Sequence, residues 1–537
     1  MDAILTSPKP LNANEWFEAV QLREKFFKSF IGYLATEVAL QTGLNRIQVE
    51  SFIKEVLAKS ADEYDDSNIA VSKGEDFIGD DSEDPGPYNF NIDLVIKQKK
   101  LIIRGIHFPV TDERFGFDYI RLFVLFPSLH FFNCHFYCES LPLDHMDICI
   151  RFETCTFHLP WQVEEGSGSG HDHVLFDGCR FEQGVALQGN ELGQSPIDNA
   201  SAFFRDCAID ETLFLKNMTT EIPVFANTHA HKPEIARINI ENCELSGRFA
   251  LSNAEAIAEI QLTSTVFQGK FALIHCSLIK LAIKNVNFYG LADFYQSSFD
   301  RLLIQKSIFQ DFAGFEGCRF GASGQQNGSI LLRYVTFYSF INFRGAQFFL
   351  PLDLRNTNRR EPPNFLDCVF NKKARKGTDR ETFRIIKHSF EAVGNRIEAN
   401  VFYALEMEAY RRELREAASK PGGHWRLWER LLVSLNFVLS RHGQSYWQPL
   451  LGVLICAAVI ALQQANLQHG WLVWPESATW CTDPLMNTLN AWASGVIVLR
   501  LFYAAFPGHE AFILLMMVML STCIWHFLVA TRRHHRG

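Results

Sequence analysis

The sequence lacks the short motifs that mark common enzyme classes. It contains no G-x-x-x-x-G-K-[ST] phosphate loop, no G-x-S-x-G nucleophile turn and no H-E-x-x-H zinc helix. Its start, MDAILTSPKPLNANEW, lacks the basic and apolar segments of a secretory signal. The formal net charge of -9 lacks the basic excess of general nucleic-acid binders. We therefore expect neither an enzyme nor a nucleic-acid-binding protein.

The 13 cysteines lack the spacing of a metal site. A structural zinc site needs close pairs such as C-x-x-C with a second pair elsewhere. Cys134 and Cys138 are the one near pair, and no matching pair accompanies them. The HDH and HAH segments at 171–173 and 229–231 lie in Gly- or Pro-containing insertions, which is typical of solvated loops. We expect free, buried thiols in a reducing compartment, and no metal or other cofactor.

Phenylalanine is in excess, with 48 residues against 13 tyrosines and 10 tryptophans. In the clearest region large apolar residues recur every 10 or 11 positions, and each follows a small or β-branched residue by two positions. Strands with alternating side chains give this pairing, whereas heptad helices do not. Two steps make a coil of about 21 residues, and stacked coils bury a continuous core. The recurring residues are Phe267, Leu278, Phe288, Phe299, Phe309 and Phe320.

The small position of this pair accounts for most of the cysteines. Eight of the 13 lie there, among them Cys318, two residues before Phe320. Free cysteine is among the most buried residue types and behaves as a small hydrophobe. We therefore expect one inward-facing core stack containing Cys318, Phe320, Phe309, Phe299, Phe288 and Phe267.

The segments CRF, CTF, CVF, SSF and AQF resemble the repeat unit of the pentapeptide-repeat family, whose members are right-handed quadrilateral β-helices. The resemblance covers roughly residues 89–371. Only alternate units keep the pattern, and insertions such as VEEGSGSGHDH interrupt it. The resemblance implies a single-stranded, right-handed, pentapeptide-like β-helix with irregular coils at 89–371.

The flanks of this repeat have helical periods. Residues 1–60 contain two amphipathic segments, which we expect to cap the open end of the solenoid, with partner binding as the alternative. An acidic linker follows at 61–88. Residues 372–420 predict one charged connector helix, and part of it resembles the connector of bacterial membrane-anchored pentapeptide-repeat proteins.

The C-terminal part predicts a helical membrane domain at 446–537. Residues 421–445 favour an amphipathic helix in the membrane interface, with a core helix as the alternative. Apolar runs at about 446–463 and 511–530 predict spans, and the second ends in a basic stop. The segment 486–506 carries Arg500 and is either re-entrant or a third span. Two spans place the basic flanks on one side, so we favour them.

These elements favour a membrane-anchored β-helix interaction protein that acts as a sensor or effector. We expect an unknown protein partner on the solenoid, contacts with membrane lipids, and a homo-oligomeric membrane domain that conducts ions or perturbs the membrane. Arg500 and His526 are the candidate functional residues there, and a snorkelling anchor is the alternative for Arg500. The expected location is the inner membrane with the β-helix in the cytoplasm. A passive tethered scaffold is the alternative, and a DNA-mimicking pentapeptide-repeat protein is less favoured.

Overall fold

The computed structural model of the chain describes residues 31–36, 38–40, 43, 45–51, 100–105, 107–108, 128–139, 149–163, 175–189, 202–226, 233–322, 328–418, 427–469 and 510–535. It forms two compact units. The solenoid unit comprises Met1–Pro351 and Arg355–Asn371, and the helical unit comprises Leu352–Leu354 and Lys372–Gly537. Each unit is described by itself.

The solenoid unit contains the predicted β-solenoid, with about nine turns spanning residues 129–370. Among the described residues its strands form four sheets. The first sheet contains β1 (Lys100–Arg104), β3 (Ser128–Phe132), β5 (Cys149–Glu153), β8 (Phe176–Asp177) and β11 (Phe204–Arg205). The second runs through β2 (His107–Phe108), β4 (His135–Phe136), β6 (Thr156–Phe157), β9 (Arg180–Phe181), β12 (Ala208–Lys216), β14 (Glu234–Glu241), β17 (Ile257–Thr263), β20 (Ser277–Lys284), β23 (Ser298–Gln305), β26 (Arg319–Phe320), β30 (Gln347–Phe348) and β33 (Val369–Phe370), with β7 (Trp161–Val163), β10 (Val185–Gln188) and β27 (Ile330–Arg333) beside it.

The other two sheets complete the later coils. The third contains β13 (Thr219–Thr220), β15 (Glu244–Leu245), β18 (Val266–Phe267), β21 (Asn287–Phe288), β24 (Ile308–Phe309), β28 (Thr336–Phe337) and β32 (Asn358–Arg359). The fourth contains β16 (Phe249–Ser252), β19 (Phe271–Ile274), β22 (Ala292–Asp293), β25 (Ala313–Gly314) and β29 (Ile341–Asn342).

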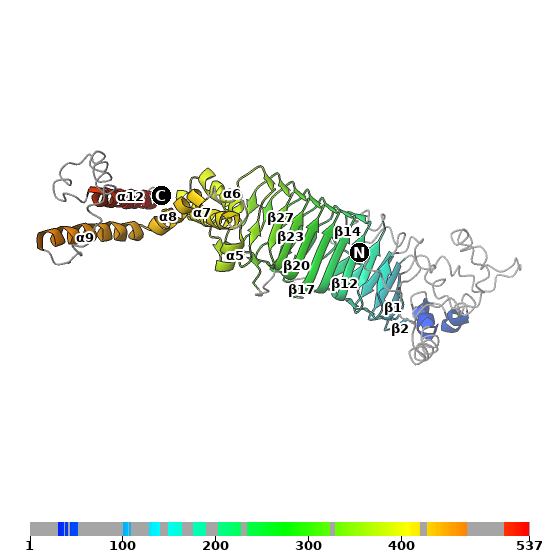
Figure 1. The fold of residues 1–537 in the computed structure, drawn as a ribbon. Coiled ribbons are helices and arrows are strands. Elements are labelled where there is room, and N and C mark those ends of the chain that lie inside the picture. The colour runs from blue at the N-terminus through cyan, green and yellow to red at the C-terminus, as the bar shows by residue number, and fades with distance from the viewer. Residues whose placement is uncertain are drawn as a thin grey trace, which may run out of the picture. The chain divides into compact units, whose positions relative to one another are not determined.

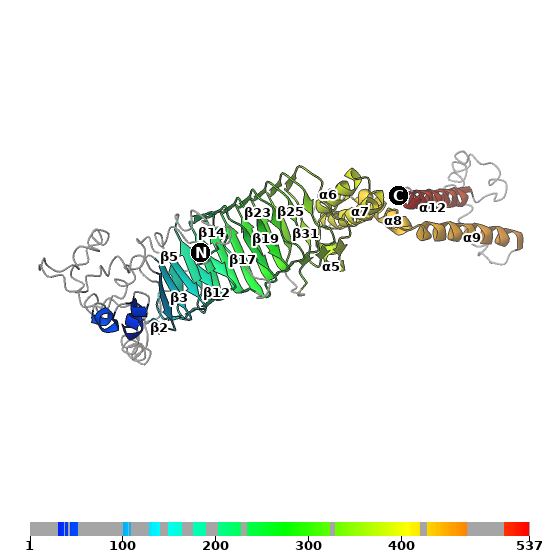
Figure 2. The same ribbon diagram turned by 180° about the vertical axis from the view of Figure 1, so that it is seen from behind.

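Neighbouring strands in each sheet belong to successive coils and pair in parallel. Leu278 of β20 lies opposite Phe299 of β23, which lies opposite Phe320 of β26. Figures 1 and 2 show β17, β20 and β23 side by side, seen from the two faces. Because a coil takes 21 residues here, the same position returns above itself, and side chains of one kind form columns.

The corners of the coils repeat as well. Asn242, Ser264, Asn285 and Lys306 have positive φ angles of 54°, 50°, 56° and 51°. Asn enters this left-handed region at the lowest cost among non-glycine residues. At another corner a Cβ on Gly269 would lie 2.5 Å from a carbonyl oxygen of the preceding coil, so only glycine fits. These repeated corners fix the path of each coil.

Helical residues precede the first strand. The described residues at 31–36, 38–40 and 46–51 are helical, as the amphipathic pattern predicts. The Tyr33 hydroxyl donates to the carbonyl of Ile102 in β1 at 3.2 Å. The first helix therefore contacts the first described strand of the solenoid, where a cap is expected.

The connector is not the single helix that its periodicity predicts. It divides into α5 (Lys372–Gly377), α6 (Arg380–Ala392) and α7 (Arg396–Ala418). Asp379 caps α6 by accepting from the backbone N–H of Thr382 at 2.9 Å. Gly394 has a φ of +79°, which reverses the chain after α6. A 3.6-residue period continues across such a reversal, so the pattern alone cannot show the break. β31 (Leu352–Asp353) also belongs to the helical unit.

The remaining helices are α8 (Leu427–Ser440), α9 (Trp447–His469) and α12 (Glu510–His535). Within the described residues one helical segment, Ala511–Arg533, is long and apolar enough to cross a membrane, and the apolar part of α9, Trp447–Ile460, is shorter. Length and composition alone are weak evidence for a span. The segment 486–506, with Arg500, lies outside the described residues.

α9 and α12 run antiparallel. A Cβ on Gly443, just before α9, would lie 2.5 Å from Arg533 Nη1, near the end of α12. Nine residues further along, a Cβ on Gly452 would lie 2.8 Å from Cys523 Sγ, ten residues before Arg533. The start of α9 therefore lies beside the end of α12, and a small residue allows the two helices to approach closely.

Candidate functional site at the helical junction

The residues predicted as one core stack lie in two columns. Phe267, Phe288 and Phe309 stack on the third sheet, with ring centroids 5.2 and 4.6 Å apart. Phe299 and Phe320 stack on the second sheet at 5.8 Å. All five are essentially unexposed. Steps of 10 and 11 residues therefore alternate between two sheets of one coil.

Two further columns are also filled with large side chains, contrary to the expectation that only alternate units keep the pattern. One contains Ile283, Ile304 and Leu332, and the other contains Phe294, Phe315, Phe343 and Phe365, all buried. In the coil from Leu278 to Phe299 the buried residues 278, 283, 288, 294 and 299 follow at steps of five or six. The sequence reasoning missed these columns because it searched for a small residue two positions earlier.

The thiols of the small column serve the architecture. Cys318 Sγ donates to the carbonyl oxygen of Phe294 in the preceding coil at 2.8 Å. One coil earlier the hydroxyl of Ser297 makes the same bond to Leu273, also at 2.8 Å. Burial raises the pKa of the Cys276 thiol to about 11, so it stays protonated at neutral pH. In the described part of the chain no group of three or more metal-ligating side chains occurs.

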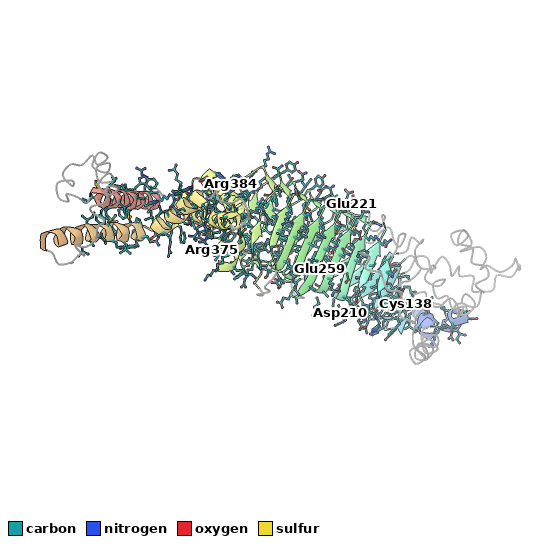
Figure 3. All side chains as sticks on the ribbon, viewed as in Figure 1. Cys138, Asp210, Glu221, Glu259, Arg375 and Arg384 are labelled. Atoms are coloured by element: carbon teal, nitrogen blue, oxygen red, sulfur yellow. The ribbon has the colours of Figure 1, made fainter. Side chains whose placement is uncertain are left out.

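Side chains on the outer surface of the solenoid pair between coils. Lys280 Nζ lies 2.6 Å from Glu259 Oε1, and Arg180 lies 2.9 Å from Asp210. Figure 3 labels Glu259 and Asp210 along the strands. Such exposed pairs are weak, and they follow the repeat rather than converge on one place. The HDH and HAH segments lie outside the described residues.

Polar side chains do converge in the helical unit, where α7, α8, α9 and α12 meet. His526, predicted as a functional residue, lies here. Its Nδ1 is 3.3 Å from the hydroxyl oxygen of Ser440, the last residue of α8, and both residues are buried. The contact joins residues 86 positions apart in the chain. We call this region, built around Arg411, Ser440, His442, His526 and Arg533, the helical junction.

Arg533 ties the end of α12 to two other parts of the junction. Its Nη1 donates to the carbonyl oxygen of His442 at 2.5 Å. Its guanidinium lies over the ring of Tyr403 in α7, 4.6 Å from the centroid. A cation over an aromatic face is attractive, and more so when partly shielded from water. The chain end of α12 is therefore bound to α7 and to the turn before α9.

The turn between α8 and α9 has an unusual backbone. Arg441, His442 and Gly443 have φ angles of 48°, 60° and 85°. Non-glycine residues in this region are strained, by about 1–3 kcal/mol each. The carbonyl of Ser440 accepts from the backbone N–H groups of Gly443 and Gln444 at 2.9 and 3.0 Å, which holds the turn. The absence of a side chain at Gly443 lets Arg533 approach.

His442 is the most unusual side chain of the junction. It is 1% exposed, and neither ring nitrogen has a hydrogen-bond partner. Burial, together with repulsion from Arg411 and Arg533, lowers its pKa from 6.5 to about 4. Arg411 itself lies over Phe437 at 3.6 Å from the ring centroid, and its Nε has no partner. The imidazole is therefore neutral near pH 7 and sits between two cations.

Other contacts join α7 to its neighbours. The half-buried Lys387 of α6 pairs with Glu406 of α7 at 2.9 Å, and the side-chain amide of Gln444 donates to the carbonyl of Asn400 at 2.6 Å. The Tyr410 hydroxyl also bonds Glu429 of α8. Figure 3 labels Arg375 and Arg384 on the connector helices. This arrangement can transmit movement between the connector and the C-terminal helices.

Sequence reasoning identified His526 but not Arg411, His442 or Arg533 as parts of one site. The single relevant signal was the basic stop at the end of the last apolar run. Comparison with protein families, with curated proteins and with solved structures finds no match, so the geometry carries the functional argument alone.

Proposed function

We propose that the chain is a membrane-anchored β-solenoid that acts as a sensor or effector. The solenoid binds a protein partner, and the connector helices pass the effect to an oligomeric membrane domain containing α9 and α12. Arg533 carries the proposal, because it binds the end of an apolar helix to the turn before α9 and to Tyr403 of the connector. A helix that served as a simple tether would need no such contact.

The topology that we propose has two membrane crossings. α9 and α12 are antiparallel, with Gly443 beside Arg533, so two crossings leave both ends on one side. Arg441, Arg532 and Arg533 then lie on that side, which the positive-inside rule makes cytoplasmic. The solenoid follows them into the cytoplasm at an inner membrane. α8 lies in the interface, which is supported by its exposed Trp428, Leu432 and Val438.

For the solenoid we propose a right-handed, pentapeptide-like β-helix without enzymatic activity. The buried residues at steps of five or six support this type, and parallel crossovers are right-handed in nearly all proteins. The paired, dispersed surface charges favour binding of a protein over catalysis or nucleic-acid binding. The same features and the membrane anchor argue against a DNA mimic.

Amide hydrogen exchange in liposomes tests the coupling. Full-length protein is compared with Arg533→Gln and with Arg532→Gln, a control that removes the same charge from an exposed neighbour. We expect Arg533→Gln to speed exchange in α7 and in the last solenoid strands, β30 and β33, and the control to leave both unchanged. Faster exchange confined to α12 would instead identify a passive tethered scaffold.

Ion flux tests the membrane activity separately. Proteoliposomes that carry no current with or without a solenoid-binding partner, together with an Arg500→Ala variant that leaves cells unaffected, would exclude a pore. A reporter fused after Gly537 tests the topology, since an extracytoplasmic signal contradicts two crossings. Neither result depends on the exchange experiment.

A further inference from the structure

The helical junction contains positive charge that the described residues do not neutralise. Arg411 and Arg533 each place one guanidinium face on an aromatic ring, at 3.6 and 4.6 Å from the centroid. Among the described residues neither forms an ion pair with a carboxylate, and Glu408 influences Arg411 only from a distance. A guanidinium has five N–H donors, and Arg533 uses one of them on the carbonyl of His442. Most of these donors are left for another acceptor.

The junction also contains buried polar atoms without partners. Both ring nitrogens of His442, Nε of Arg411 and Oε1 of Gln448 are buried and form no hydrogen bond with described atoms. Buried polar atoms in proteins are paired as a rule, so each exception calls for a reason. Three of these four atoms belong to cationic or protonatable side chains. A ligand with several acceptor oxygens would satisfy them.

The backbone holds this arrangement in place. Arg441, His442 and Gly443 are held in the left-handed region, and any side chain at position 443 would collide with Arg533. The turn and the guanidinium are therefore positioned before any ligand binds. A cluster whose side chains and backbone are fixed in advance loses less entropy on binding.

We propose that Arg411, Arg533 and His442 bind a phosphate group. Planar guanidinium groups match phosphate oxygens with two parallel hydrogen bonds, and the imidazole supplies a further donor. Burial and the two arginines lower the pKa of His442 to about 4, and a bound anion would offset the repulsive part of that effect.

The phosphate comes either from an anionic phospholipid headgroup or from a soluble phosphate ester. Arg533 ends the apolar segment Ala511–Arg533, and the exposed aromatic residues Tyr446 and Trp447 lie at the start of α9. Aromatic residues at helix ends are typical of the headgroup level of a bilayer. This placement rests on the proposed membrane function, whereas the binding chemistry does not.

Native mass spectrometry of the full-length protein in a neutral detergent tests the site. Equal amounts of phosphatidylglycerol and phosphatidylcholine are added, and the retained lipids are counted. We expect a preference for phosphatidylglycerol that falls about tenfold in Arg533→Gln and Arg411→Gln, as for the loss of one charge-assisted hydrogen bond. Arg532→Gln and Arg384→Gln, which each remove an exposed charge, should keep the preference.

A second arm distinguishes the sources of phosphate. If millimolar glycerol phosphate displaces the lipid or binds without it, the site accepts a soluble ester; if not, it requires the lipid. Arg533→Lys keeps the charge but loses the paired donors, so a partial loss shows that folding survives. No lipid preference and no phosphate binding, or equal loss in the control variants, would overturn the site. A retained preference with unchanged exchange in the solenoid would refute the coupling alone.

Discussion

Three consecutive residues of one strand provide a sharp test of the role of the repeated cysteines. Cys318 and Phe320 are unexposed, and Arg319 between them is exposed. Phe320 stacks between Phe299 and Phe348, with centroids at 5.8 and 5.0 Å. Truncation to alanine removes a ring from the middle of a column, and such changes cost about 3–5 kcal/mol.

The cysteine change should be far milder. Serine occupies the same position one coil earlier, where the Ser297 hydroxyl donates at 2.8 Å, as Cys318 Sγ does. Cys318→Ser can therefore form the same bond to the Phe294 carbonyl, and we expect a cost below about 1 kcal/mol. Arg319→Ala changes an exposed side chain and should cost about 0.5 kcal/mol or less.

Thermal unfolding of the full-length protein in detergent, followed by the far-ultraviolet circular dichroism of the strands, measures the differences. For a unit of this size each kcal/mol shifts the midpoint by about 2–4 °C. Phe320→Ala should lower the midpoint by roughly 6–20 °C, and Cys318→Ser by less than about 4 °C. A shift for Cys318→Ser as large as that for Phe320→Ala would refute the purely architectural role of the thiol.

Gly269→Ala should disrupt its coil, since the new Cβ would lie 2.5 Å from a backbone oxygen, and limited proteolysis should cut there first. Burial beside two arginines lowers the pKa of His442 from 6.5 to about 4, so the unfolded chain takes up the proton first; the stability of the helical unit should fall as the pH drops from 6.5 towards 4, and His442→Asn should remove that dependence of the melting midpoint. Mild oxidation should cross-link Cys456 to Cys523 within one chain, and Gly452→Leu should reduce the yield measured by mass spectrometry, because its side chain would push the helices apart.

The solenoid was largely predictable because its information is local and repeated. A residue such as Phe288 is followed after one coil by Phe309 in the same environment, so spacing alone reveals that both face the core. The columns through Phe294 and Ile283 were equally regular but lacked the small residue used as the signal. The break of the connector at Gly394 was also missed, because a turn between two helices need not disturb their period.

The helical junction could not be predicted in this way. It joins Ser440 to His526 and His442 to Arg533, pairs separated by 86 and 91 residues that occur once each. A contact that is not repeated leaves no periodic trace, and a basic residue after an apolar helix has the same sequence signal whether it faces water or a buried imidazole.

The sequence by itself therefore determined that the chain contains a solenoid with phenylalanine columns, followed by helices with an apolar end. Only the tertiary structure decided that these columns number more than the repeat suggested, and that Arg411, His442 and Arg533 meet. The physical reason is the range of the interactions. Side-chain alternation within a coil is fixed by the residues of that coil, whereas the meeting of three helices depends on packing between distant segments, which no local pattern encodes.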